Sequence, residues 1–216
     1  MDDPREVDSY DQLSKKHLGL VERLFIKRSI ILLNRTPGRN NSFVLDVGTG
    51  TANIPVQFAQ TVPGIRFIAL DLSLPMLKRA QYNIRESGCY DRILLVCADA
   101  EHLPFRDQSF DFVMSHSTMH HLKNPLTSVR EIVRVTKHGN RFIVRDLRRP
   151  SSWLLNIYVH VFGWPYDRFM KKMYLKSLHA GFTFTDMKQI ARSTEGAIVT
   201  ARRFFITHVG LEGMRK

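Results

Sequence analysis

The chain has 216 residues, of which 44% are apolar and 24% are charged. This balance is typical of one globular domain and excludes a disordered chain. Cys89 and Cys97 lack the spacing of a metal site, and two cysteines in a chain of this length argue against a secreted disulfide scaffold. The formal net charge is +12, and residues 145–216 carry 13 Lys and Arg against 5 Asp and Glu. A basic segment of this kind attracts nucleic acid, anionic lipid or an anionic small substrate, or it only keeps the surface soluble.

The N-terminal residues are acidic and polar, unlike a signal peptide, and no apolar stretch is long enough to span a bilayer. We therefore expect a soluble, cytoplasmic protein. Apolar spacing predicts one or two amphipathic helices over residues 10–33, followed by a loop. Residues 42–50 then form an apolar run that ends in glycines, as a buried parallel strand does when it enters a tight turn.

The strand and helix pattern repeats from there to residue 147. Strands are predicted at 65–73, 92–100, 110–117 and 140–147, with helices at 52–62, 74–88 and 124–139 between or before them. A turn at His138-Gly139-Asn140 is expected to separate the last helix from the last strand. This alternation predicts a doubly wound, mostly parallel α/β sheet with right-handed crossovers.

After residue 147 the pattern changes. Residues 151–176 are aromatic and apolar, and Gly163 and Pro165 are expected to divide them into two helices. Residues 182–196 read as a helix that Thr185 or Asp186 caps, and residues 197–210 as one or two strands.

The motif DVGTGTA at residues 46–52 directly follows the first strand. Gly48 permits a tight turn with positive φ, and Gly50 lets a ligand approach the backbone closely. A glycine-rich turn alone does not distinguish a dinucleotide enzyme from other nucleotide-binding proteins. Asp46, however, precedes the glycines, where a carboxylate would repel a pyrophosphate and attract a cationic amino group.

Two further acids end the next two strands. Asp71 is placed to accept hydrogen bonds from ribose hydroxyls, and Asp99, followed by Ala100, is suited to an adenine amine. With Asp46, they line the crevice at the carboxyl ends of the strands. Three acids there fit a positively charged nucleoside that carries an amino acid.

These motifs, together with DLSxPML, DAxxLPFxDxSFD and HHLxNP between residues 71 and 125, resemble class I S-adenosylmethionine-dependent methyltransferases. The resemblance covers about residues 10–150 and is strongest to the ubiquinone and menaquinone biosynthesis type, which acts on small molecules. It implies a Rossmann-like, mostly parallel seven-stranded sheet with N-terminal helices and a helical lid inserted after the fifth strand. It also implies S-adenosylmethionine as cofactor and S-adenosylhomocysteine as product.

The resemblance assigns cofactor contacts residue by residue. The methionine part is expected at the turn after the first strand, the ribose and adenosine at the second, the adenine at the third, and the underside of the cofactor at the fourth, with an N-terminal tyrosine folded over it. The residues in this order are Asp46, Gly48, Thr49 and Gly50; Asp71, Leu72 and Met76; Asp99 and Ala100; Ser115 and His116; and Tyr10.

The resemblance also implies a single domain in four parts: an N-terminal helical cap (1–40), a cofactor-binding core (41–150), a helical lid (151–180) and a C-terminal helix with strands (181–216). Ala52 replaces the usual third glycine of the turn and His138-Gly139-Asn140 the usual Pro-Gly-Gly. Both changes leave the cofactor site intact.

Methyl transfer from a sulfonium needs positioning and electrostatics rather than a covalent intermediate. A base is required only where the accepting atom must lose a proton. His120 or His121 is the candidate general base, and the alternative is that both pack against the sheet and cap the next helix. His116 and His120 are spaced across a strand–loop junction rather than a helix face, so we expect no metal site.

Residues 153–174 occupy the place of the substrate lid in the related enzymes. They are expected to enclose an apolar or aromatic acceptor, to lie on a membrane surface, or to add to the core. Arg148, Trp153, Tyr158 and Trp164 are the candidate substrate contacts, and neighbouring cations indicate an anionic group on the acceptor.

The predicted function is methyl transfer to a small molecule. An RNA methyltransferase, favoured by the basic charge, and a cofactor-binding protein without turnover remain as alternatives. A nicotinamide oxidoreductase is disfavoured because Asp46 is present and the full G-x-G-x-x-G pattern is not. The sequence specifies neither the acceptor nor the oligomeric state.

Overall fold

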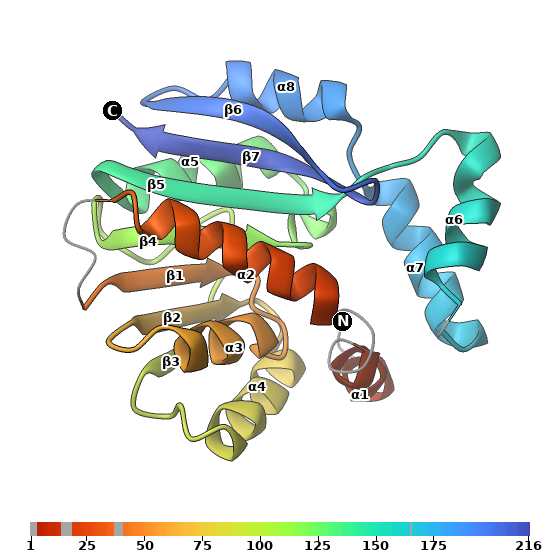
Figure 1. Ribbon diagram of the computed structural model, residues 1–216, viewed down its shortest axis with the longest axis horizontal. Coiled ribbons are helices and arrows are strands. Elements are labelled where there is room, and N and C mark those ends of the chain that lie inside the picture. Colours follow the sequence, from red (N-terminus) through yellow and green to blue (C-terminus); the bar gives the residue numbers. More distant parts are fainter. Residues whose placement is uncertain (1–3, 14–18, 37–40, 165) are drawn as a thin grey trace.

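The computed structural model describes residues 4–13, 19–36, 41–164 and 166–216. Their centre is one seven-stranded sheet in the order β3-β2-β1-β4-β5-β7-β6 (Figure 1). Strands β1 to β5 are parallel to one another, whereas β7 is antiparallel to both β5 and β6. The predicted seven-stranded, mostly parallel fold is therefore confirmed. The strands are β1 (Phe43–Val47), β2 (Arg66–Asp71), β3 (Ile93–Cys97), β4 (Phe110–His116), β5 (Thr136–Leu147), β6 (Ala197–Phe204) and β7 (His208–Arg215).

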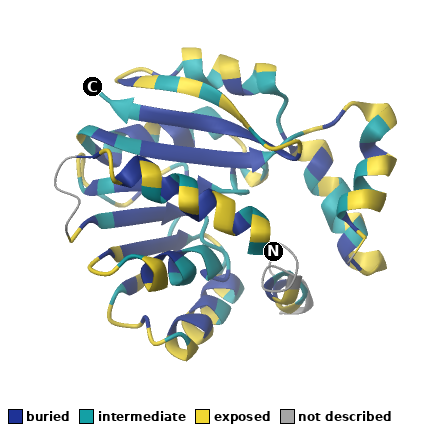
Figure 2. Cartoon of the chain, in the orientation of Figure 1, coloured by how far each residue is buried: buried dark blue, intermediate teal, exposed yellow. Residues whose placement is uncertain are grey.

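Helices cover both faces of the sheet, as a parallel sheet requires. Consecutive strand residues point alternately into two apolar cores: Val44 and Phe112 pack into one, Leu45 and Val113 into the other. Helices α2, α3 and α4 cover the first core and α5 and α8 the second (Figure 1). Figure 2 shows the strands as mostly buried and the outer helix faces as exposed. The helices are α1 (Pro4–Leu13), α2 (Gly19–Leu33), α3 (Asn53–Thr61), α4 (Leu74–Glu86), α5 (Pro125–Val135), α6 (Leu155–Phe162), α7 (Arg168–Ala180) and α8 (Phe184–Arg192).

Side-chain caps fix where two of the core helices begin. Ser73 accepts a hydrogen bond from the Met76 amide and Asn124 from the Thr127 amide, in each case ahead of a proline in the first turn. These bonds satisfy amides that have no partner within the helix. Because both caps directly follow strand-end segments, they also set the geometry of the cleft described below.

Two predicted boundaries are wrong. Helix α5 ends at Val135, and the turn expected at residues 138–140 lies inside β5, where the register against β4 shifts between Phe110 and Phe112. Gly139, with φ of +73°, supplies the backbone conformation that such a bulge needs. Helix α8 is capped by Thr183, which forms a reciprocal capping box with Asp186.

Helices α6 and α7 form an arm at the end of the sheet where β5 finishes (Figure 1). Gly163 ends α6, and a side chain there would collide with the Val159 carbonyl, since a Cβ would lie 2.3 Å from its oxygen. The predicted break at Pro165 lies outside the described residues. Among the helices that the structure describes, none is long and apolar enough to cross a membrane.

Candidate functional site

The turn after β1 is held by backbone hydrogen bonds and close packing. The amides of Gly48 and Thr49 both donate to the Leu70 carbonyl (2.8 Å each). Gly48 has φ of +76°, and a Cβ there would lie 2.1 Å from Thr118 Cγ2, so no other residue fits. The sequence-based assignment of this turn to Gly48 therefore has a steric basis.

Asp71, at the tip of β2, ties the second strand to this turn. Its Oδ2 accepts a hydrogen bond from the Gly50 amide (2.8 Å) and its Oδ1 one from the Ser73 amide (2.9 Å). Burial raises the pKa of Asp71, while these hydrogen bonds oppose the rise. The carboxylate is thus fixed at the edge of the cleft, where its remaining lone pairs are available to hydroxyl donors.

Asp46 lies deeper, at the end of β1, with 2% of its surface exposed. Burial raises its pKa to about 7; the Thr49 hydroxyl opposes the rise and the negative charge of Asp71 adds to it. A ligand with a fixed positive charge would restore the ionised form of this carboxyl group. The residues at the turn therefore fit a cationic ligand and disfavour a phosphate.

A small cavity opens directly over this carboxylate. Five of the predicted cofactor residues line it: Asp46, Gly48 and Thr49 at the end of β1, His116 at the end of β4, and Tyr10 on α1. Its lining is Tyr10, Glu22, Asp46, Gly48, Thr49, Thr51, Asn53, Ile54 and His116. Sequence analysis missed Glu22, Thr51, Asn53 and Ile54. Only Asn53 and Ile54 could have been found from the sequence, because they begin the helix that directly follows the glycine turn.

Helix α1 is held over the turn by Asp11, whose side chain is completely buried. Arg79 Nη2 donates to Asp11 Oδ2 (2.8 Å), and Asn83 Nδ2 donates to Oδ1 (2.8 Å). Asn53 Nδ2 makes a longer bond to the same oxygen (3.4 Å). Helices α3 and α4 thus hold α1 through one carboxylate, and this contact carries Tyr10 to the cleft.

The segment after β3 carries the predicted adenine residues. Asp99 Oδ1 accepts a hydrogen bond from the Glu101 amide (2.8 Å), and its side chain remains 46% exposed beside the buried Ala100. Glu101 in turn accepts hydrogen bonds from the amides of Lys123 and Asn124. The contact of Asp99 and Ala100 with an adenine base stays a prediction.

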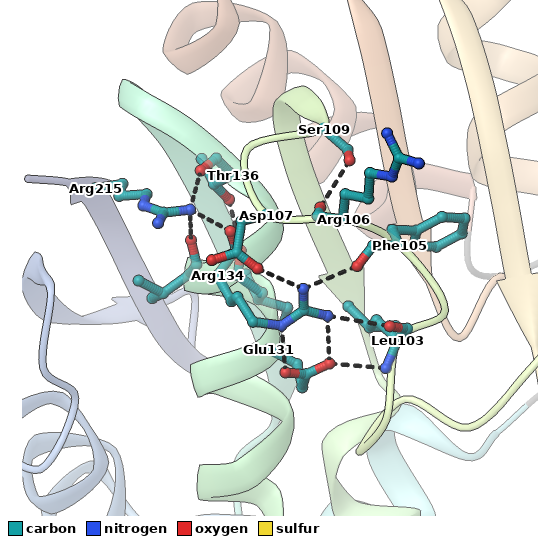
Figure 3. A network of polar contacts seen from close by, with 11 residues as sticks. Leu103, Phe105, Arg106, Asp107, Ser109, Glu131, Arg134, Thr136 and Arg215 are labelled. Atoms are coloured by element: carbon teal, nitrogen blue, oxygen red, sulfur yellow. Dashed lines mark hydrogen bonds and ion pairs between the residues drawn. The ribbon is translucent and has the colours of Figure 1, made fainter.

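A polar network fixes the rest of this loop to α5 (Figure 3). Arg134 donates to the carbonyls of Leu103 (3.0 Å) and Phe105 (2.8 Å) and forms an ion pair with Asp107 (2.8 Å). Glu131 binds the Arg134 guanidinium and accepts a hydrogen bond from the Leu103 amide (2.8 Å). The loop is therefore rigidly positioned without contributing these side chains to the cavity.

Below the cleft, at the end of β4, Ser115 and His116 differ in role. Ser115 is fully buried and donates to the Val47 carbonyl (2.8 Å), so its hydroxyl serves the sheet. His116 lines the cavity, stacks on Phe25 and accepts a hydrogen bond from Arg145 Nε (3.2 Å). Burial, with the nearby Arg145 charge, holds the pKa of His116 well below its usual range. His116 is therefore a neutral wall of the cavity.

The 3₁₀ helix η2 (Met119–His121) brings a second pair of side chains together. His120 Nδ1 donates to Asp146 Oδ1 (2.7 Å), and both side chains are buried. The same carboxylate accepts hydrogen bonds from the amides of His120 and Leu147. His120 Nε2 is buried and has no hydrogen-bond partner among the described residues. The arrangement orients an imidazole with a free basic nitrogen.

His121 stacks next to His120, with ring centroids 4.0 Å apart. Surrounding protein atoms and the neighbouring imidazole lower the pKa of His121 to about 4, although part of its surface reaches the solvent. Within the part of the chain that the structure describes, no carboxylate binds the ring of His121 as Asp146 binds that of His120. Of the two predicted bases, the geometry favours His120.

Residues 45–144 match the methyltransferase domain family. This part of the chain is a methyltransferase domain. A ubiquinone/menaquinone biosynthesis C-methyltransferase from Pseudomonas paraeruginosa is 32% identical over 148 residues, which are 68% of this chain and 57% of that protein. A demethylmenaquinone methyltransferase from Lactiplantibacillus plantarum is 35% identical over 54% of this chain and 49% of that protein. The chain thus spans about half the length of these relatives.

The comparison with solved structures agrees with the family match. A crystal structure of an S-adenosylmethionine-dependent methyltransferase from Aquifex aeolicus superposes with a TM-score of 0.72, at 17% identity and full coverage of both chains. The predicted class I methyltransferase fold and the S-adenosylmethionine cofactor are confirmed by the family match and these likenesses. The division of the chain into four parts stays a prediction. The carboxylate of Asp46 suits the ammonium group and the sulfonium of this cofactor, and the binding of its methionine part at this cavity stays a prediction.

The remaining predicted cofactor residues lie around the same edge of the methyltransferase domain. Met76 is buried in the first turn of α4, and Leu72, next to Asp71, is 67% exposed. Their contacts with the adenosine stay predictions.

The predicted acceptor contacts do not line the cavity. The Arg148 guanidinium and the Tyr158 hydroxyl both donate to the Ile206 carbonyl (3.5 and 3.0 Å), at the tip of the β6–β7 hairpin. Trp153 and Trp164 are 74% and 82% exposed. The structure thus places Arg148 and Tyr158 against the hairpin tip and the two tryptophans on the outer surface, and it brings α7 into contact with η2.

Proposed function

We propose that the protein transfers a methyl group from S-adenosylmethionine to a ring carbon of a small hydroxylated aromatic acceptor of the quinol type. The names of the two relatives support this acceptor class, since one is a C-methyltransferase of quinone biosynthesis and the other a demethylmenaquinone methyltransferase. Carbon methylation of such a ring requires loss of a hydroxyl proton, and therefore a base.

The observation that carries the proposal is the buried His120–Asp146 pair. His120 Nδ1 carries the proton and donates it in a hydrogen bond to Asp146. The lone pair of the imidazole is therefore on Nε2. A purely structural histidine in this position would be expected to use both ring nitrogens, because an unpaired buried polar atom costs about 1–3 kcal/mol. The free Nε2 is the group that a hydroxyl of the acceptor would satisfy.

The chemistry follows from this geometry. When bound, S-adenosylmethionine supplies an electrophilic methyl group. His120 Nε2 takes the proton of the acceptor hydroxyl, and Asp146 stabilises the imidazolium that results. The phenolate oxygen raises the electron density at the adjacent ring carbon. This carbon would form the new bond to the methyl carbon as the bond from the methyl carbon to the sulfonium sulfur breaks, which leaves S-adenosylhomocysteine as the neutral thioether. The ring carbon would then lose its hydrogen as a proton to water, and the ring would regain its aromaticity.

The surroundings of the pair fit an aromatic acceptor. Helix α7 packs against η2, and Tyr166 and Tyr174 on the arm stack edge to face (5.3 Å between centroids) with Met170 beside them. Burial raises the pKa of Tyr166 to about 12, so its hydroxyl stays protonated and is available as a donor. An apolar lining with few polar groups is usual for small-molecule sites.

The test uses His120→Asn with a prenylated 1,4-naphthoquinol as acceptor and radiolabelled S-adenosylmethionine. Asparagine keeps a donor at the place of Nδ1 and so retains the bond to Asp146, but it lacks Nε2. We expect kcat to fall by about 10²–10⁴ while the affinity for S-adenosylhomocysteine stays within twofold. His138→Gln, an exposed site in the β5 bulge, is the matched control and should retain full activity.

Three results would contradict the proposal. Undiminished turnover in His120→Asn would make His120 structural. Cofactor binding without methyl incorporation into any hydroxylated aromatic would favour a binding protein without turnover. Methyl incorporation into bulk tRNA in place of the quinol would favour the RNA methyltransferase.

A further inference from the structure

The arm carries a stripe of exposed apolar side chains on its outer surface. Trp153, Ile157, Val161 and Trp164 follow one another at intervals of four, four and three residues along η3 (Ser152–Leu154), α6 and the start of the next turn. At 100° per residue they fall within about 80° of one another around the helix axis. Their exposed fractions are 74%, 52%, 60% and 82%.

The tip of the β6–β7 hairpin extends this stripe. Phe205 and Ile206 are 72% and 50% exposed, and the Ile206 carbonyl accepts the hydrogen bond from the Tyr158 hydroxyl of α6. The hairpin tip thus adds exposed apolar side chains next to α6, from a segment nearly 50 residues further along the chain. A contiguous patch of this kind on a folded domain marks an interaction site.

The charges around the patch are of one sign. Residues 147–176 contain six Lys and Arg and a single carboxylate, Asp167, which caps α7 by accepting from the Met170 amide. Between residues 150 and 166 the sequence has no Asp, Glu, Lys or Arg. On α7, Arg168 and Lys172 are exposed. An apolar stripe rich in tryptophan and bordered by cations is complementary to an anionic bilayer surface.

We propose that the outer face of the arm, formed by α6 and the β6–β7 hairpin tip, docks on the surface of an anionic lipid bilayer. Tryptophan and aliphatic side chains enter the interfacial region, and the neighbouring lysines and arginines bind lipid phosphates. None of the described helices is long and apolar enough to span the bilayer. A protein partner with an apolar groove would not need the ring of cations, and a second copy of this chain would bring like charges together.

Docking would orient the methyltransferase domain. The outer stripe of the arm faces the lipid, whereas α7, on the same arm, packs against η2. The bilayer would therefore lie next to the side of the domain that carries the His120–Asp146 pair. An apolar acceptor could then pass from the lipid to the site without crossing bulk water.

The chain itself provides the probe, because Trp153 and Trp164 are its only two tryptophans. We would titrate the full chain with vesicles of phosphatidylcholine alone and of phosphatidylcholine with phosphatidylglycerol (3:1), and record tryptophan emission and vesicle flotation. With the anionic vesicles we expect a blue shift of the tryptophan emission and co-flotation of the protein. The affinity for the neutral vesicles should be at least tenfold lower. Raising the salt to 0.5 M should remove most of the difference between the two vesicle types.

Two variants separate the apolar and charged contributions. Ile157→Ser/Val161→Ser keeps both tryptophans and should weaken vesicle binding at least tenfold. Arg168→Glu/Lys172→Glu should do the same with anionic vesicles only. The control is Tyr90→Ser/Ile198→Thr, which removes equally exposed apolar groups away from the arm. Unchanged affinity for S-adenosylhomocysteine verifies folding in every variant.

An emission spectrum that no lipid changes would overturn the proposal, as would equal vesicle binding by all three variants. A blue-shifted spectrum without lipid, accompanied by sedimentation as a dimer, would assign the patch to a second copy of the chain. The test does not depend on turnover, so the proposed methyl transfer and the proposed docking can fail separately.

Discussion

The cofactor cleft and the arm are built in opposite ways. In the cleft, the carboxylate of Asp71 binds two backbone amides, and the amides of Gly48 and Thr49 share the Leu70 carbonyl, so each group is held by several bonds. The arm lies at one end of the sheet, and its outermost helix, α6, is bonded to the hairpin tip through the Tyr158 hydroxyl. Its tryptophans point to the solvent.

The difference separates two tasks. Binding the methyl donor needs fixed charges and fixed backbone, and the sheet supplies both at its carboxyl edge. Receiving the acceptor needs a surface suited to the surroundings in which that acceptor is found. In our proposal this surface is the apolar and basic arm, which lies outside the sheet. Changes in the cleft should therefore alter cofactor affinity alone, and changes in the arm should alter delivery of the acceptor.

The largest effect is expected for Asp71→Ala. It leaves the buried amides of Gly50 and Ser73 without their acceptor and removes the partner of the ribose hydroxyls. The loss of several charge-assisted hydrogen bonds should weaken S-adenosylhomocysteine binding by at least 100-fold in titration calorimetry. Asp91→Ala, at an exposed site between α4 and β3, is the control. If vesicle binding fell in parallel, the separation of the two regions would be refuted.

A smaller effect is expected from the pH dependence of cofactor affinity. Burial raises the pKa of Asp46 to about 7. Above pH 7 the ionised carboxylate attracts the ammonium group of the ligand, whereas below pH 7 it must first lose a proton. The Kd for S-adenosylhomocysteine should therefore increase about tenfold between pH 8 and pH 6. In Asp46→Asn binding should be weak and independent of pH; a sloping profile in that variant would assign the titration to another group.

The smallest effect is expected for Asp11→Ala, which tests whether α1 belongs to the cleft. The change removes the bonds from Arg79 and Asn83 that hold α1 over the turn. We expect S-adenosylhomocysteine to dissociate about three- to tenfold faster, and amide exchange in residues 4–13 to accelerate. Asp8→Ala is the control on the same helix, since Asp8 is exposed and lies 3.8 Å from Arg79. Equal behaviour of the two variants would show that α1 is not held by Asp11.

Several residues that the sequence predicts for the cleft lie together in the structure, because each of them carries a local signal. Asp46, Gly48 and Asp71 stand at the ends of strongly apolar strands, and the parallel arrangement of strands brings such ends together. The same reasoning identified the histidines after β4. It did not choose between His120 and His121, because Asp146, which holds His120, is 26 residues away in the sequence.

Features that depend on distant packing could not be predicted. Glu22 occupies the first turn of an amphipathic helix, where an acid is usual, yet it is buried against the cavity. The aromatic residues of the arm have the same helical spacing in the sequence whether they face a pocket or the solvent. The structure shows that Trp153 and Trp164 are exposed to the solvent. The β5 bulge was missed because Gly139 is typical of both a turn and a bulge.

The position of β7 has a consequence for how the chain acquires its shape on the ribosome. This strand lies between β5 and β6, and within the described residues β6 pairs with no other strand. The edge of β5 therefore stays open until residues 208–215 have been synthesised, and α8 and β6 have no completed sheet to join before then. Arg215 closes the arrangement by donating to the carbonyls of Val133 and Thr136, where α5 meets β5. Loss of these last eight strand residues would leave an unpaired edge exposed to aggregation.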